Sequence, residues 1–420
     1  DVVDIDGALT QDGGAVFNEA SADVDFRVES NGNANMLFVD GGNNAVGIGT
    51  GSPSEPLHVQ EGSSGITSRA GTIALIDGSG NTKLTIASGA TSTGELLFGR
   101  STDNDAGRII YDHNDNSLSF YASSSERFRI SSDGSLSTPT AGTSNVRFGV
   151  NAGDSIASGG NYNVVVGDEA GTAITTGDNN VAVGYASLDA NTTASNNTAV
   201  GYASLTTNTT GTQNVAVGYS AGAAVTTGIR NTLMGGLAGD AITTASYNVA
   251  LGYEALTVDT LGSNSVAIGA FALRDQNFTS ATNAYNVGIG YEAGGSITTG
   301  TLNTIIGGEA GTAITTGDSN VAVGYAALYS NTTADKNIAV GMKSGEFITT
   351  GENNTHTGYL AGRGITGAKS TGDYNTTYGS VAGNKLQGAA TQNTLIGGLA
   401  GDAITTASAN TAVGYASLSA

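Results

Sequence analysis

The stretch that decides the fold is GDEAGTAITTGDNNVAVG, residues 167–184, whose first and last Gly stand 17 residues apart. Its frame of an Asn, three mostly small or β-branched residues and then a Gly recurs from about residue 145 onward. The closing Gly stands at positions 149, 167, 184, 201, 218, 235, 252, 269, 290, 307, 324, 341, 358, 379, 397 and 414. Eleven of the fifteen intervals are 17 residues, and two intervals of 21 contain four-residue insertions, after Gly269 and after Gly358. A fixed period of this length is typical of a solenoid.

Each repeat contains a short apolar trio, such as Val181-Ala182-Val183. In a strand, residues two apart point to the same face, so we expect Val181 and Val183 to face the core and Ala182 to point the other way. Gly184 is expected to turn a corner with a positive φ angle. The Asn before the trio suits the other corner, because Asn tolerates the left-handed region.

A pair of Thr residues stands eight and nine residues after the Gly in most repeats, for example at 175–176 and 192–193. This pair is a candidate second strand. Stacked turns would align the hydroxyl groups into ladders in which they hydrogen-bond to one another.

In each turn, the fourth and the seventh residue after the corner Gly are related: only one of the two carries a large apolar side chain. Where the fourth residue after the Gly is Leu, as at Leu188, the seventh is polar, as at Asn191. Where the fourth is Gly, as at Gly171, the seventh is aliphatic, as at Ile174. All complete turns follow this rule, including the turn with Gly362 and Ile365. We infer one interior slot per turn, filled from either side, so Ile174 and Leu188 are predicted core residues together with Val181, Val183 and Gly184.

A turn of 17 residues holds two strands of about five residues and two corners, but no helix. The sequence therefore predicts an all-β fold, an elongated parallel β-roll or solenoid of 17-residue turns preceded by small β modules. A two-strand turn has a thin core, which favours a homotrimer over a lone chain. The handedness, and the choice between a trimer and a single-chain solenoid, stay open.

Three zones are expected: residues 1–65 as an N-terminal β segment, 66–144 as a small strand-rich module with a linker, and 145–420 as the β-roll. In the first two zones we predict strands at residues 24–28, 36–39, 72–76, 83–86, 95–98, 108–111, 118–121 and 127–130. The stretch 134–144, around Pro139, is predicted to be a linker.

The 420-residue chain carries a formal net charge of −21, and only 12% of its residues are charged. This charge argues against binding to nucleic acid or to an anionic membrane, because both need clustered Lys and Arg. The chain has no Cys, so disulfides and thiolate metal sites are excluded. No run of about 18 apolar residues is present, so no membrane insertion is predicted.

Half of the sixteen Tyr residues directly follow a corner Gly. They are Tyr185, Tyr202, Tyr219, Tyr253, Tyr291, Tyr325, Tyr359 and Tyr415. One hypothesis is an aromatic stripe that stacks on the sugars of a receptor. The alternative, which we favour from the sequence, is a structural ladder that seals turn to turn or chain to chain.

No catalytic or metal site is predicted, and no cofactor. The acidic clusters at 103–105 and 112–115 lack the full calcium-loop patterns, so they are interpreted as solvated turns. His58, His113 and His356 share no ligand spacing. The Gly-rich segments lack the Lys-Ser/Thr ending of a phosphate loop, and no catalytic triad can be argued.

The motif Asn264-Ser265-Val266-Ala267-Ile268-Gly269 resembles the head repeats of trimeric autotransporter adhesins, although the period is longer here. That resemblance implies a trimeric, left-handed parallel β-roll. The segments 22–30, 36–40, 46–59 and 107–113 look like those of bacteriophage tail-fibre proteins.

These resemblances imply a homotrimeric, non-catalytic virion fibre that mediates attachment to a host and contacts other virion proteins and a surface glycan or receptor. One alternative is a trimeric adhesin on a bacterial surface. Another is a fibre-borne polysaccharide depolymerase, which needs a cleft with paired carboxylates that the repeats do not supply in register.

Overall fold

A computed structural model describes residues 26–30, 33–61, 74–78, 84–100, 103–139 and 141–419. Strands and turns make up these residues, and none of them lies in a helix. The described part of the chain therefore has no helix that could cross a membrane. The chain divides into two compact units, residues 1–89 and 90–420.

The first unit contains a five-stranded sheet in sequence order. Its strands are β1 (Phe26–Ser30), β2 (Asn33–Asp40), β3 (Ala45–Ile48), β4 (Leu57–Glu61) and β5 (Ala74–Gly78). The first three strands pair antiparallel, and β3, β4 and β5 pair parallel. This sheet extends past residue 65, where the sequence placed a boundary, because β5 pairs with β4.

The second unit begins with an antiparallel sheet of five strands. They are β6 (Thr93–Arg100), β7 (Asp103–Asp112), β8 (Ser117–Ala122), β9 (Ser125–Ile130) and β10 (Leu136–Ser137). The short β10 lies inside the stretch predicted to be a linker, where it pairs with β9. The strand predicted at 83–86 is wrong for its described part, because residues 84–86 form no strand and leave Leu84 and Ile86 exposed.

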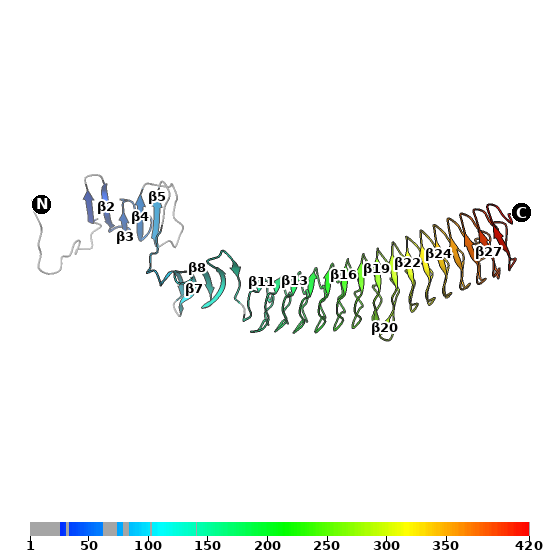
Figure 1. Cartoon of the computed structure of the whole chain (residues 1–420). Helices are drawn as coiled ribbons and strands as arrows, with labels where there is room; N and C mark the ends of the chain where they lie inside the picture. The colour runs from blue at the N-terminus through cyan, green and yellow to red at the C-terminus, as the bar shows by residue number, and fades with distance from the viewer. Residues whose placement is uncertain are drawn as a thin grey trace, which may run out of the picture. The chain divides into compact units, whose positions relative to one another are not determined.

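The repeat region forms a parallel sheet of sixteen strands, one for each turn (Figure 1). The strands are β11 (Val146–Phe148), β12 (Val164–Val166), β13 (Val181–Val183), β14 (Thr198–Val200), β15 (Val215–Val217), β16 (Thr232–Met234), β17 (Val249–Leu251), β19 (Val266–Ile268), β21 (Val287–Ile289), β22 (Thr304–Ile306), β23 (Val321–Val323), β24 (Ile338–Val340), β25 (Thr355–Thr357), β26 (Thr376–Tyr378), β27 (Thr394–Ile396) and β28 (Thr411–Val413). Equivalent residues of successive turns pair directly, as Ala182 does with Ala199. The predicted parallel solenoid of 17-residue turns is thus confirmed.

The direction of the strand side chains is opposite to the prediction. Ala182 is completely buried, whereas Val181 and Val183 are partly exposed on the outer face. Beside Ala182 the interior is filled by Leu188 from the opposite loop, which leaves room for only a small residue on the strand, whereas strands between two turns with Gly at the fourth position bury a larger one, such as Leu233. Assigning Val181 and Val183 to the core was therefore wrong, whereas Ile174 and Leu188 are fully buried as predicted.

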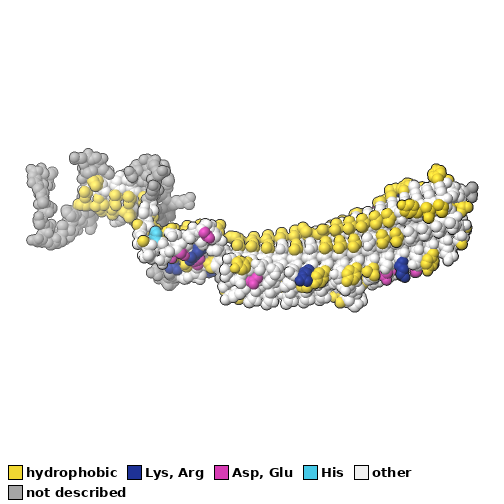
Figure 2. All heavy atoms as spheres, in the orientation of Figure 1, with side chains coloured by type: hydrophobic (Ala, Val, Ile, Leu, Met, Phe, Trp, Pro, Cys, Tyr) yellow, Lys and Arg dark blue, Asp and Glu magenta, His cyan; other side chains and the backbone are white. Residues whose placement is uncertain are grey.

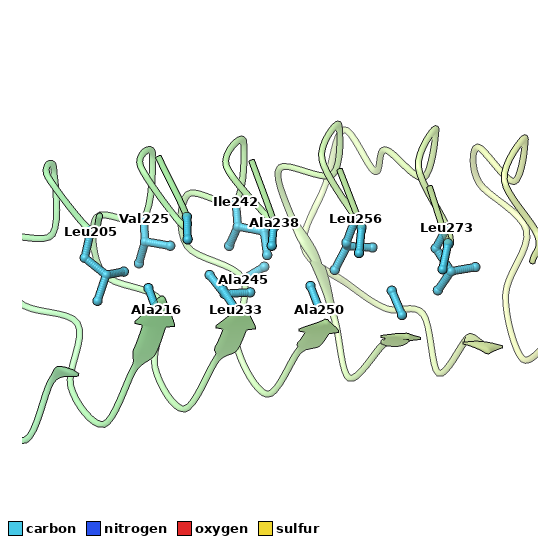
Figure 3. Packing of buried hydrophobic residues seen from close by; sticks show 14 of the residues in the cluster. Leu205, Ala216, Val225, Leu233, Ala238, Ile242, Ala245, Ala250, Leu256 and Leu273 are labelled. Atoms are coloured by element: carbon cyan, nitrogen blue, oxygen red, sulfur yellow. The ribbon is translucent and has the colours of Figure 1, made fainter. Parts of the chain in front are cut away.

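The shared interior slot is confirmed. A Cβ atom built on Gly171 would lie 2.7 Å from Cδ1 of Ile174, so a side chain from either position enters the same space. Figure 3 shows Leu205, Val225 and Ile242 projecting from the loop side toward the strands. The turn with Gly362 departs from the rule, because the imidazole ring of His356 occupies the space above this Gly and Ile365 stays partly exposed.

The corners also differ from the prediction in one respect. Gly184 has a φ of 123°, and a Cβ there would lie 2.5 Å from the carbonyl oxygen of Gly201, so a Gly is required. At the other corner, Asn179 takes the left-handed conformation with a φ of 57°. Asn180 is instead buried, and its side chain hydrogen-bonds to neighbouring turns.

The Thr pairs form no second strand, so each regular turn contains one strand of three residues rather than two strands of five. Their hydroxyl groups also do not bond to one another. Thr175 Oγ1 donates to the backbone carbonyl of Thr192 at 3.0 Å, and Thr192 Oγ1 donates to that of Thr209 at 3.4 Å. These bonds link each turn to the next through the backbone.

Candidate receptor-contact surface

The eight tyrosines that follow a corner Gly form a stripe along the solenoid, which we call the tyrosine stripe. Because the turns stack in register, residues at equivalent positions lie above one another. All eight side chains are exposed, from 45% at Tyr185 to 80% at Tyr415. The sequence therefore located a row of solvent-facing aromatic rings.

At its N-terminal end the stripe is a continuous stack. The ring centroids of Tyr185 and Tyr202 lie 5.3 Å apart at an interplanar angle of 17°, and those of Tyr202 and Tyr219 lie 5.4 Å apart at 12°. Rings arranged in this way stabilise each other and cover each other's faces. In this segment the geometry favours the ladder interpretation.

Beyond Tyr219 the stripe changes character, because a tyrosine no longer follows every corner Gly. Gly236 stands between Tyr219 and Tyr253, and Gly308 stands between Tyr291 and Tyr325. The stack uses one face of the Tyr219 ring, and Gly236 on the other side has no side chain to cover the second face. The ring of Tyr253 lies over Gly236, with its Cδ2 atom 3.5 Å from where a Cβ of Gly236 would be, so the regular stack of rings is interrupted at this turn.

One aromatic residue of the surface was missed by the sequence reasoning. Phe271 makes edge-to-face contacts with Tyr253 at 5.6 Å and with Tyr291 at 5.9 Å, measured between ring centroids. It stands two residues after the corner Gly instead of one. The sequence did contain a signal for it. In this turn the residue directly after the corner Gly is Ala270, and the aromatic residue comes one position later.

Carboxylates accompany the rings. Glu254, Glu292 and Glu309 each stand two residues after a corner Gly. The Tyr325 hydroxyl donates to Glu309 Oε2 at 2.9 Å, and this hydrogen bond, together with the charge of Glu309, raises the pKa of Tyr325. A hydrogen bond to Glu292 and its charge likewise raise the pKa of Tyr291. Tyr291 and Tyr325 therefore stay protonated at neutral pH.

A ring beside a carboxylate can bind a sugar. The ring supplies an apolar surface for the C–H face, and the carboxylate accepts hydrogen bonds from hydroxyl groups. The same carboxylates disfavour an anionic ligand, because like charges repel.

The other candidate positions do not form a site. In the turn at 113–116, Asp112 accepts the backbone N–H of Asn114 at 2.8 Å and Asp115 forms an ion pair with Arg129 at 2.8 Å, as in a solvated turn. The side chains of 103–105 lie outside the described residues. Among the described residues, no group of three His, Cys, Asp or Glu could hold a metal ion.

The three histidines have separate environments. The Nδ1 atom of His58 accepts the backbone N–H of Ser54, and His113 packs edge-on against Tyr111. His356 is buried, and its Nδ1 atom lies 2.8 Å from the hydroxyl of Thr377.

No family model, curated protein or solved structure matches this chain.

Proposed function

We propose that this chain is a homotrimeric, non-catalytic fibre of a virion, and that its tyrosine stripe contacts a neutral glycan on the host surface. The observation that carries the proposal is the pairing of exposed aromatic rings with carboxylates along a regular solenoid. The virion assignment rests on the resemblance of the N-terminal segments to tail-fibre proteins. Other virion proteins are the partners expected for those segments.

The regular stacking supports a fibre in particular. Each turn is held to the next by backbone and side-chain hydrogen bonds, so the solenoid presents many similar sites in single file. Many weak contacts to a repeating surface polymer add up to firm attachment, because the later contacts form at a high effective concentration. A neutral glycan fits better than an acidic one, since the chain has a net charge of −21.

The test is binding of the full chain to an array of neutral and acidic bacterial surface oligosaccharides. We expect binding to neutral members, and its loss in a Tyr219→Ala/Tyr253→Ala variant. The matched control is Tyr285→Ala/Tyr374→Ala, two tyrosines of comparable exposure that lie outside the stripe. The proposal fails if no glycan is bound or if the two double variants lose binding equally.

Two further measurements address the alternatives. Immunogold labelling should mark virions, and labelling of uninfected bacterial cells would identify a bacterial adhesin instead. Incubation of the chain with bacterial capsular polysaccharide should release no oligosaccharide, because release would identify a depolymerase.

A further inference from the structure

The outward side of the sixteen-stranded sheet is a second surface, which we call the sheet face. In fifteen of its strands, β12 to β28, the first and third residues point outward and the middle residue is buried, as in Val249-Ala250-Leu251, whereas the middle residue of β11 is the partly exposed Arg147. The sheet face therefore carries two columns of side chains along sixteen turns. The strand sequences place Val, Ile, Leu, Met, Phe, Tyr or Thr at all of these positions, and no charged residue.

These side chains are partly exposed in the single chain, and some of the apolar ones are exposed to a third or more of their surface. Met234 is 44% exposed, Ile306 36% and Ile338 40%. Figure 2 shows hydrophobic side chains in rows along much of the repeat region. With sixteen strands spaced by about 4.8 Å, the face extends roughly 70 Å by 10 Å, or about 700 Å². A soluble monomer rarely exposes an apolar patch of more than a few hundred Å².

The distribution of charge limits the kinds of partner that can bind the sheet face. A chain with a net charge of −21 repels its own copies unless they meet where the charges are absent, and the sheet face is such a place. A basic protein or a nucleic acid would instead bind through charged groups, and the outward positions of this face carry none. Its area is close to the roughly 800 Å² that each partner contributes to a standard stable interface.

The order of residues along the columns indicates the relative orientation of the copies. In the first column, the N-terminal strands β11, β12 and β13 carry Val, whereas the four C-terminal strands β25 to β28 carry Thr. Parallel, in-register copies set Val against Val and Thr against Thr, so the hydroxyl groups can pair. An antiparallel arrangement would set the hydroxyl-rich end against the all-Val end and leave the hydroxyl groups unpaired.

We propose that the sheet face is the contact surface between parallel, in-register copies of this chain. The partner must match a surface that has no charged side chain at its outward positions and that repeats at one strand spacing over sixteen turns, and a second copy of the chain carries the same surface. This inference concerns the assembly part of the proposed function. The glycan contact is tested on a different set of residues, so one can fail without the other.

The experiment compares two triple variants of the full chain by sedimentation equilibrium and native mass spectrometry. One variant, Val217→Lys/Met234→Lys/Leu251→Lys, introduces three charges in the third column of the sheet face. The control, Thr210→Lys/Thr227→Lys/Thr244→Lys, introduces the same charges in the same turns at exposed positions outside that face. Circular dichroism of each variant verifies that the solenoid is folded.

We expect the unmodified chain and the control to form one oligomer, with three copies as predicted from the sequence, and the sheet-face variant to dissociate at least tenfold more readily. Val183→Cys should then be joined between copies by a bismaleimide cross-linker with a reach of about 10 Å, the distance between sheets that pack face to face, because in-register copies place equivalent residues opposite each other. A monomeric unmodified chain, or equal assembly of the two triple variants, would overturn the proposal. Assembly of Val183→Cys without this cross-link would overturn the parallel, in-register arrangement.

Discussion

At the scale of single residues, the interior slot decides which side chains the solenoid accepts. Leu188 has a φ of 50°, a left-handed conformation that is unfavourable for a residue with a Cβ. Its side chain is nevertheless fully buried, because the slot would otherwise be empty. Filling the core offsets the backbone strain.

We predict that Ile174→Ala destabilises the protein by about 2–5 kcal/mol, since it leaves a cavity in a fully buried slot. Gly171→Leu alone is also destabilising, because its side chain collides with Ile174 and with Val165 on the neighbouring strand. In the double variant the new Leu fills the cavity, so part of the loss is recovered. A double-mutant cycle of urea unfolding measures this coupling, and losses that simply add would contradict the shared slot.

His356 makes stability depend on pH. Burial lowers its pKa from 6.5 to about 4, so the folded protein keeps the ring neutral. The unfolded chain binds the proton first as the pH falls, and stability is therefore fully present above pH 6.5 and is lost between pH 6.5 and about 4. The shift corresponds to about 3 kcal/mol.

We predict that His356→Leu removes this contribution to the pH dependence. Leu395, at the equivalent position of another turn, shows that a Leu fits there beside a Gly. Urea unfolding midpoints of both proteins at pH 7, 5 and 4 provide the measurement. The carboxylates titrate in both proteins, so only the difference between the two curves reports on His356. Parallel curves would show that the ring is accessible to protons in the folded state.

At the scale of elements, a ladder of buried amides runs beside the strands. The backbone N–H of Asn197 donates to Asn180 Oδ1 at 3.0 Å, and Asn180 Nδ2 donates to the Ala194 carbonyl at 2.9 Å. At position 265 the ladder has a Ser in place of the Asn, and the side chain of Gln276 supplies the missing amide. Gln276 Nε2 donates to Ser265 Oγ at 3.0 Å, and Gln276 Oε1 accepts from Asn286 Nδ2 at 2.9 Å.

We predict that Gln276→Ala destabilises the fold by about 1–3 kcal/mol for each buried polar group that loses its partner. Asp259 is among these groups, because its buried carboxylate accepts from Gln276 Nε2 at 2.6 Å. Adding Ser265→Asn restores an amide to the ladder and should recover part of the loss. Thermal unfolding of the two single variants and the double variant tests this, and a double variant no more stable than Gln276→Ala would contradict the substitution of one amide for the other.

The sequence predicted the period, the positive φ of Gly184, the burial of Ile174 and the positions of the tyrosines. It did not predict the outward direction of Val181, because an alternating trio fits either face of a strand. The larger residue normally faces inward, and here the slot filled from the opposite loop reverses that rule. The contacts of Phe271 were also missed, because they depend on the stacking of turns and not on spacing within one turn.

At the scale of the molecule, stability is carried from turn to turn. In each regular turn the contacts reach only the neighbouring turns, through parallel strand pairing and hydrogen bonds between residues 17 apart. The stability of such a stack is approximately the sum of the turns and their interfaces. One turn can then be removed while the others stay folded, provided that the deletion removes a whole repeat and leaves the remaining turns in register.

We predict that deletion of residues 185–201, one whole turn between two corner glycines, leaves the circular dichroism spectrum unchanged and lowers the melting temperature by only a few degrees. Deletion of residues 185–192 removes half a turn, interrupts the amide ladder and moves a corner Gly out of register, so we expect a much larger loss. Both deletions must be compared at one protein concentration, because association of copies shifts apparent stability. Hydrogen exchange should show normal protection on both sides of the whole-turn deletion. If the whole-turn deletion unfolds as readily as the half-turn deletion, the turns are not independent stacking units.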